Sequence, residues 1–232
     1  MAEWSYLAVG RISRTFGHHT GRRDICRGLR RDRRTCVSLQ DFEQWRPADL
    51  GFYVPRRQNG ELHSLLLRAI DHGIFTLGPT TIARIDRDRL IGEIIDHPNV
   101  TIALWWNALQ REAILRERIT AIGRRDAYAR VAHLLCEMFQ RLRLVGETVD
   151  QRYMLPVTQA EMGDALGISE VYANRMLRRL QNEKLIVYDQ RVVRIPDLDA
   201  LKHAAEFDGQ YLHLDGAPQA VRDAVSAQRL MP

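Results

Sequence analysis

Cysteine is scarce in this chain of 232 residues. Only Cys26, Cys36 and Cys136 are present, and no two of them form a CxxC pair. This spacing excludes a zinc ribbon or an iron–sulfur site of the usual kind. A long apolar run is also missing from the N-terminus, so we predict neither a signal peptide nor a membrane span. Three scattered cysteines fit a reducing compartment, and we expect a cytoplasmic protein.

Composition allows one large domain or two small ones, with a hydrophobic fraction of 45% that suits a globular core. The net charge of +5 is carried mostly by arginine, which contacts phosphates and base edges better than lysine does. Charge of this size is a weak signal by itself, because many proteins that bind no nucleic acid share it.

Residues 1–60 contain few apolar residues, keep no clear period, and carry dense arginine between Arg22 and Arg34. The short runs 36–39 and 51–55 are candidate strands. Two interpretations stay open for this segment. It is either an atypical sensor or the product of degradation or a shifted reading frame, and in the second case it could hold no ligand.

From residue 61 the pattern becomes regular. Residues 73–77 and 80–85 predict two strands around a Gly-Pro turn. Asp86 can then cap a short helix that extends through Ile95 and ends before Pro98.

Residues 99–122 predict one long helix with a broad apolar surface that includes Trp105. We expect it to pack both on its own domain and on a second copy of the chain. A helix buried wholly within its own subunit is the alternative. The two apolar rows are Ile102, Trp106, Leu109 and Ala113, and Ala108, Leu115 and Ile122.

Gly123 is expected to interrupt this helix, and residues 124–126 to open another. The second helix has a clear apolar stripe and ends near Gly146, before a polar loop at 147–152. The stripe consists of Ala127, Val131, Leu134, Met138 and Leu142.

The most informative stretch is 158–180, which predicts two helices joined at a tight corner. Thr158 and Glu161 form a capping-box pattern, Gly167 permits a sharp turn, and Ser169 caps the second helix. Gly163 is small where the helices approach each other. Two stripes are predicted to be buried: Met162, Ala165 and Leu166, and Ala173, Met176, Leu177 and Leu180. The opposite face of the second helix carries Val171, Asn174, Arg175 and Arg178, and could enter a major groove.

A hairpin follows, with strands at 185–188 and 191–195 and a turn at Asp189-Gln190. Beside a recognition helix, such a hairpin makes a winged motif. Residues 197–202 begin a final short helix, and the tail beyond Asp215 is polar.

In this order, the elements resemble the Crp–Fnr family of bacterial transcription regulators. The resemblance is strong over roughly 98–214. It implies an α+β protein with a partial, jelly-roll-like β-roll sensor domain at 1–97, of which 1–60 is poorly patterned. A long dimerisation helix at 98–122, a winged helix-turn-helix domain at 123–214 and a loose tail at 215–232 complete the expected organisation.

By resemblance, Thr158 and Ser169 contact phosphates and Arg175 reads a guanine edge, as helix N-termini and arginine forks can do. Many family members carry Glu where this chain has Val171, which could meet a thymine methyl. Glu170 lies one residue earlier, so the operator should differ from the best-known half-sites. The expected DNA-binding set is Thr158, Ser169, Glu170, Val171, Asn174, Arg175, Arg178 and Arg191.

The effector side departs from the family, so we predict no cofactor. Cyclic-nucleotide binders use Gly-Glu-Leu and a later Arg. Residues 60–62 match, but Arg68 follows too soon, and Leu115-Arg116 replaces a Thr-Ser pair. The iron–sulfur branch needs clustered N-terminal cysteines. A haem would need a ligand from His18, His19 or His63.

These patterns predict a homodimeric, sequence-specific DNA-binding regulator that acts on a near-palindromic operator, with RNA polymerase as a candidate partner. An enzyme is not expected. His63, Asp71, His72 and His97 match no catalytic or metal spacing, and Glu112 with Arg116 reads as an i,i+4 surface pair. The alternative is a winged-helix interaction module that binds no DNA. Against it stand the cations Arg175, Arg178, Arg179, Arg191 and Arg194.

Overall fold

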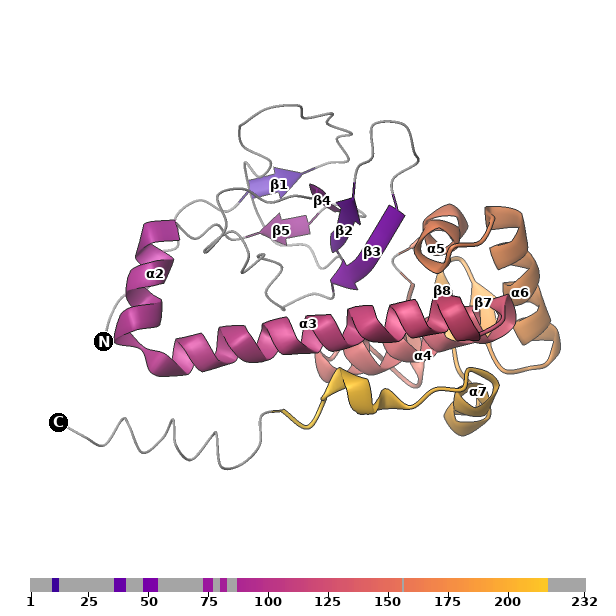
Figure 1. Ribbon diagram of the computed structural model, residues 1–232. Coiled ribbons are helices and arrows are strands. Elements are labelled where there is room, and N and C mark those ends of the chain that lie inside the picture. Colours follow the sequence, from indigo (N-terminus) through magenta and orange to yellow (C-terminus); the bar gives the residue numbers. More distant parts are fainter. Residues whose placement is uncertain are drawn as a thin grey trace.

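The computed structural model describes residues 10–12, 36–40, 48–53, 73–76, 80–82, 87–155 and 157–216 (Figure 1). Strands come first along the chain, followed by helices and a small winged unit, so the predicted α+β class is confirmed. Figure 1 shows one long helix, α3, extending beneath the N-terminal strands and reaching the winged unit at its far end. No helix within the described ranges combines the length and apolarity needed to cross a bilayer.

The N-terminal strands form two small antiparallel sheets, one ordered β1-β5 and the other β3-β2-β4. The expected strand runs at 36–39, 73–77 and 80–85 are each found at least in part, and β3 begins three residues before the expected position 51. Strand β1 was not predicted. Their bounds are β1 Gly10–Ile12, β2 Cys36–Gln40, β3 Ala48–Tyr53, β4 Gly73–Thr76 and β5 Thr80–Ile82.

Several expectations concern residues outside the described ranges. They are the Asp86 cap, the Gly-Glu-Leu segment at 60–62 with Arg68, the histidines 18, 19, 63 and 72, Asp71, and the tail from residue 217.

Helix α2 (Arg87–Asp96) is followed at once by the long helix α3 (Pro98–Arg124). The prediction that Gly123 interrupts the long helix is wrong. The helix continues through Gly123, and the Arg125 N–H still donates to the Ala121 carbonyl at 3.1 Å. Glycine lowers helix propensity by only about 1 kcal/mol, which packing of the rest of α3 can override.

The break instead falls at Arg125, whose backbone is extended. The next residue, Asp126, caps α4 (Ala127–Leu144) by accepting a hydrogen bond from the Ala129 N–H at 2.8 Å. The apolar stripe predicted for this helix is confirmed, since every member of it is buried. Helix α4 is therefore the central element of the C-terminal core.

The remaining elements pack around α4. Leu201 and Ile186 are buried and join the same cluster as the helix-turn-helix residues. The elements are β6 (Arg152–Met154), α5 (Gln159–Leu166), α6 (Glu170–Asn182), β7 (Val187–Asp189), β8 (Val192–Arg194), α7 (Leu198–Ala204) and the 3-10 helix η1 (Gly209–Leu212).

The wing differs from its prediction in two ways. It has three antiparallel strands in the order β6-β8-β7, because Arg152, expected in a polar loop, pairs with Arg194. The hairpin turn lies at Gln190 and Arg191 rather than at Asp189-Gln190. Both turn residues have positive φ, 44° and 70°, as a two-residue turn compatible with strand twist requires.

Candidate nucleic-acid interface

Helix α5 begins with the predicted capping box. The Thr158 hydroxyl accepts from the Glu161 N–H at 3.2 Å, and the Glu161 carboxylate accepts from the Thr158 N–H at 2.6 Å. Two of the free N–H groups at the helix start are thereby satisfied. The half-buried Thr158 is fixed at the N-terminal end of α5, where a helix attracts an anion.

The corner between α5 and α6 depends on two glycines. Gly167 adopts φ 64° and ψ 38°, the left-handed conformation expected of a glycine that ends a helix. A Cβ on Gly163 would lie 2.7 Å from the Ile168 carbonyl oxygen and 3.2 Å from the Glu170 nitrogen. The backbone of the turn therefore leaves no room for a side chain at Gly163, and this close contact fixes where α6 starts.

Helix α6 has one buried and one exposed face, as predicted. Ser169 caps it by accepting from the Tyr172 N–H at 3.2 Å. The predicted stripe, Ala173, Met176, Leu177 and Leu180, is buried. The outward face of α6 is therefore available for contact without any rearrangement of the core.

On that outward face, Val171 is 80% exposed, and Arg175 and Arg178 are exposed one and two helical turns further on. The Arg175 guanidinium stacks over the Tyr172 ring, with 4.2 Å between its Cζ and the ring centroid. This cation–π contact restricts the Arg175 side chain while leaving its donors accessible. Tyr172 was not among the expected residues, although its i,i+3 spacing from Arg175 was a readable signal.

Asn174 is placed differently from its neighbours. It is half-buried, and its side-chain amide donates to the Gln159 side chain on α5. Part of its hydrogen-bonding capacity therefore tethers the two helices. Gln159 was also missed by the sequence analysis, because the contact joins residues that only the corner brings together.

Arg179, which the sequence analysis counts among the cations of the helix and wing but not in the DNA-binding set, has partners within the chain. It forms an ion pair with Glu183 at 2.9 Å and stacks over the Tyr128 ring at 4.2 Å. The Tyr128 hydroxyl also donates to Glu183. Burial and the carboxylate raise the pKa of Tyr128 to about 12, and hydrogen bonds from Tyr128 and Arg179 lower the pKa of Glu183. This group holds the end of α6 on α4.

The wing supplies further cations. Arg191 is exposed at the tip of the hairpin, and its carbonyl accepts from the Leu155 N–H at 2.7 Å. Arg194 is exposed on the sheet, in register with Arg152. Glu170 is exposed in the first turn of α6, where a negative charge is favoured by the helix dipole.

The long helix α3 presents two opposite faces. Gln110, Ala113, Arg118 and Ala121 are buried against the same chain. The other face is exposed along much of the helix and carries several large apolar side chains. It carries Trp105 at 66%, Leu109 at 45%, Leu115 at 42%, Ile119 at 72% and Ile122 at 48% exposure. The expected Glu112–Arg116 pair is confirmed on this exposed face.

Trp106, the neighbour of Trp105, turns inward and meets the His213 ring edge to face at 5.8 Å. The expectation that the long helix packs on its own domain is thus met through this tryptophan. Of the four residues weighed as a reactive cluster, only His97 is described, and it lies 3.4 Å from Glu93. No group of three His, Cys, Asp or Glu suited to a metal occurs in the described ranges.

Comparison with known proteins identifies the C-terminal unit. The family model of the Crp-like helix-turn-helix domain matches residues 129–204. The transcriptional activatory protein AadR of Rhodopseudomonas palustris is 29% identical over 133 residues, which are 56% of this chain and 55% of AadR. The match therefore spans about half the length of that relative.

Solved structures extend the likeness in fold. FixK2 from Bradyrhizobium japonicum superposes with a TM-score of 0.63 at 19% identity, over 74% of this chain and 83% of FixK2. A mutant of CooA from Carboxydothermus hydrogenoformans gives a TM-score of 0.59 at 18% identity, over 75% and 76%. The resemblance stated from the sequence motif is confirmed by these matches.

Proposed function

We propose that this chain, whose residues 129–204 are a Crp-like helix-turn-helix domain, is a sequence-specific DNA-binding transcription regulator. The observation that carries the proposal is the outward face of α6. It places Val171, Arg175 and Arg178 on one exposed side of a helix whose opposite side is locked in the core. An exposed helix of this kind fits the major groove of DNA.

Each residue has a proposed task. Arg175, restrained by Tyr172, reads a guanine through two donors, and Val171 contacts a thymine methyl. Thr158 and Ser169 bind phosphates at the helix N-termini, and Arg178 neutralises a further phosphate. One donor of the Asn174 side chain is engaged by Gln159, so Asn174 reads a base with its remaining donor and its acceptor. Glu170 accepts a hydrogen bond from a cytosine amino group. Arg191 contacts the backbone from the wing tip.

The proposed assembly is a homodimer through α3. Trp105, Leu115 and Ile119 belong to an exposed apolar row at heptad-like spacing, which a parallel copy of the same helix would cover. Two recognition helices related by a two-fold axis would meet half-sites about 10 base pairs apart on a near-palindromic operator. The proposal includes no cofactor and no catalysis. It places the protein in the cytoplasm with the chromosome and leaves RNA polymerase as a candidate partner.

Selection of bound sequences from random DNA tests the proposal with the purified full chain. We expect a pseudo-palindrome to emerge. On that sequence, Arg175→Ala should cost roughly 1–3 kcal/mol and relax preference at one position of each half-site. Arg178→Ala should weaken binding to all sequences and reduce the slope of log K against log salt by about 1 per subunit.

Arg143→Ala is the matched control, because it removes the same charge from an exposed position on α4. Arg143→Ala should leave the sequence preference unchanged and should change the slope of log K against log salt only slightly. A flat salt response with no enriched sequence would contradict DNA binding and favour the interaction-module alternative. Equal losses on selected and random DNA for Arg175→Ala would contradict its base-reading role.

A further inference from the structure

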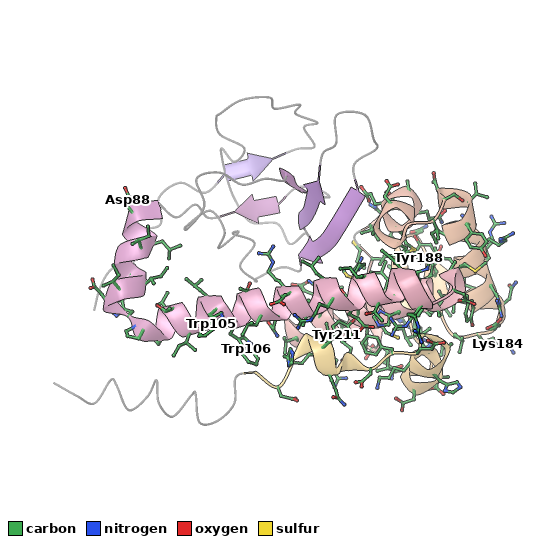
Figure 2. The ribbon with its side chains drawn as sticks, viewed as in Figure 1. Asp88, Trp105, Trp106, Lys184, Tyr188 and Tyr211 are labelled. Carbon is green, nitrogen blue, oxygen red and sulfur yellow. The ribbon has the colours of Figure 1, made fainter. Side chains whose placement is uncertain are left out.

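The segment after α7 turns back over the molecule instead of leaving it. Residues 205–213, which we call the C-terminal brace, extend from the winged unit along α4 to the middle of α3 (Figure 1). Figure 2 shows Tyr211 beneath α3, with Trp106 further along the helix toward its N-terminal end. The brace therefore lies against both α3 and the winged unit. These two parts are joined covalently at the extended link between α3 and α4, and they also meet directly at the pairs Arg118–Glu137, 3.4 Å apart, and Glu117–His133, 3.3 Å apart.

The first attachment lies at that link. The Arg125 guanidinium donates to the Glu206 carbonyl at 3.1 Å and lies 3.8 Å from the Glu206 carboxylate. Arg125 also pairs with Glu117 of α3, at 2.7 Å. The Arg125 side chain is only 11% exposed, so the brace closes over the link itself.

The second attachment is aromatic. His133 of α4 is held between Phe207 and Tyr211 of the brace, with ring centroids 4.9 and 5.8 Å away. The Tyr211 hydroxyl donates to Glu137 at 3.2 Å. Glu137 is 2% exposed and also pairs with Arg141 at 2.8 Å and with Arg118 of α3 at 3.4 Å. Brace, α4 and α3 thus share one buried charged group.

The third attachment is the furthest from the link. Gln110 of α3 donates its side-chain amide to the Leu212 carbonyl at 2.8 Å and to the His213 carbonyl at 3.2 Å. Leu212 is 2% exposed, and His213 packs on Trp106. Gln110 and Arg125 are separated by 15 positions on the helix, a lever arm of about 22 Å.

The length of this lever arm determines how far the Gln110 attachment moves when α3 rotates about the link. A 10° rotation about the link would displace the Gln110 attachment by about 4 Å, which no hydrogen bond survives. The two-residue link alone would permit such a rotation. We propose that the C-terminal brace fixes the angle between α3 and the helix-turn-helix unit, and thereby sets the half-site spacing that the dimer accepts. This inference rests on the proposed function.

Gln110→Glu is the sharpest variant, because it keeps the side-chain shape while setting a carboxylate against two carbonyl oxygens. Gln210→Glu is the matched control. It introduces the same charge into the brace at an exposed position. Tyr211→Phe, which removes only the hydroxyl that Glu137 accepts, serves as a second variant if Gln110→Glu does not fold.

The DNA readout uses synthetic operators that carry the selected half-sites at the selected spacing and with one base pair inserted between them. One base pair rotates one half-site relative to the other by about 34°, so a rigid dimer should lose about tenfold in affinity or more. We expect this loss for the wild type and for Gln210→Glu. For Gln110→Glu we expect the penalty to fall to about threefold or less. An unchanged spacing penalty in Gln110→Glu and Tyr211→Phe would overturn the brace.

Hydrogen exchange of the full chain without DNA separates failure of the brace from failure of the proposed function. Amides of residues 123–127 and 205–213 should exchange about tenfold faster in Gln110→Glu than in Gln210→Glu. Equal exchange in both variants would refute the brace even if the wild type selects an operator. Faster exchange together with no operator selection would support the brace as a structural element and refute its role in DNA spacing.

Discussion

Adding one methyl group at Gly163 and at Gly123 should change stability in opposite directions. Both glycines lie in helices, and alanine is favoured there by about 1 kcal/mol. At Gly123, within the described part of the chain, no atom beyond the adjoining backbone of α3 itself lies within 4 Å of the position that a Cβ would occupy, so the substitution gains that propensity without a clash. At Gly163, the same Cβ would lie 2.7 Å from the Ile168 carbonyl oxygen, a backbone atom that cannot rotate away.

The size of the effect at Gly163 follows from this contact. An ordinary carbon–oxygen contact is several tenths of an ångström longer, so the backbone at Ile168 and the start of α6 must shift. Overpacking of this kind costs typically 1–3 kcal/mol, and a backbone obstacle belongs at the upper end. After the gain in propensity is subtracted, Gly163→Ala should destabilise the helix-turn-helix unit by about 1–2 kcal/mol. Gly123→Ala should stabilise α3 by about 0.5–1 kcal/mol.

Native-state hydrogen exchange measures both changes, because it reports opening free energies for α5 and α6 separately from those for α3. Gly163→Ala should also weaken operator binding more than its loss of stability requires, since α6 starts from a displaced turn. A Gly163→Ala protein as stable as the wild type, with unchanged affinity, would show that the close contact does not fix the corner. A destabilised Gly123→Ala would mean that this glycine is needed for a bend.

Two further predictions concern α3 and its surroundings. Ile119→Glu places a charge in the middle of the exposed apolar row, so in sedimentation it should shift the protein from dimer to monomer. Thr120→Glu, at the neighbouring exposed position, is the control and should dissociate the dimer less. Equal dissociation by both variants would argue against a dimer through this row. Burial lowers the pKa of His133 to about 4, against the opposing effect of the Glu137 and Glu117 carboxylates. The unfolded chain then binds the extra proton between pH 6.5 and 4, so stability should fall by as much as about 3 kcal/mol as pH decreases through this range. His133→Gln should flatten that slope in pH-dependent denaturation, and an unchanged slope would assign the acid sensitivity to other groups.

The local elements of the winged unit could be predicted from sequence because their signals are short-range. The Thr158–Glu161 capping box and the Ser169 cap lie within one helical turn of the groups they satisfy, and both are present. The buried stripe of α4 follows from helical periodicity alone. The strand at Arg152 was missed, since a three-residue strand carries almost no pattern and forms only because β8 lies beside it.

At the interface, the sequence determined which residues α6 exposes, because the cap, the corner glycine and the apolar period together fix the orientation of that helix. It could not show that Arg179 is tied to Glu183 and Tyr128, since Tyr128 comes from α4, 51 positions earlier in the chain. Asn174 is tethered to Gln159 for the same kind of reason. The spacing of residues along the sequence predicts which polar and charged side chains lie on the exposed face of α6, but it does not predict which side chains elsewhere in the chain they contact.

The sequence by itself thus determined the order of the helices from α2 to α7, the caps, the recognition helix and the presence of a broad apolar surface on α3, all of which depend on residues close together along the chain. Only the tertiary structure decided that α3 continues through Gly123 and that residues 205–213 return to Gln110 and Glu137. Those contacts join residues separated by 74 and 102 positions. They form because Leu212 becomes buried and because Glu137 on α4 pairs with Arg118 on α3 while it accepts from Tyr211 on η1. No periodicity in the sequence encodes contacts among three separate elements.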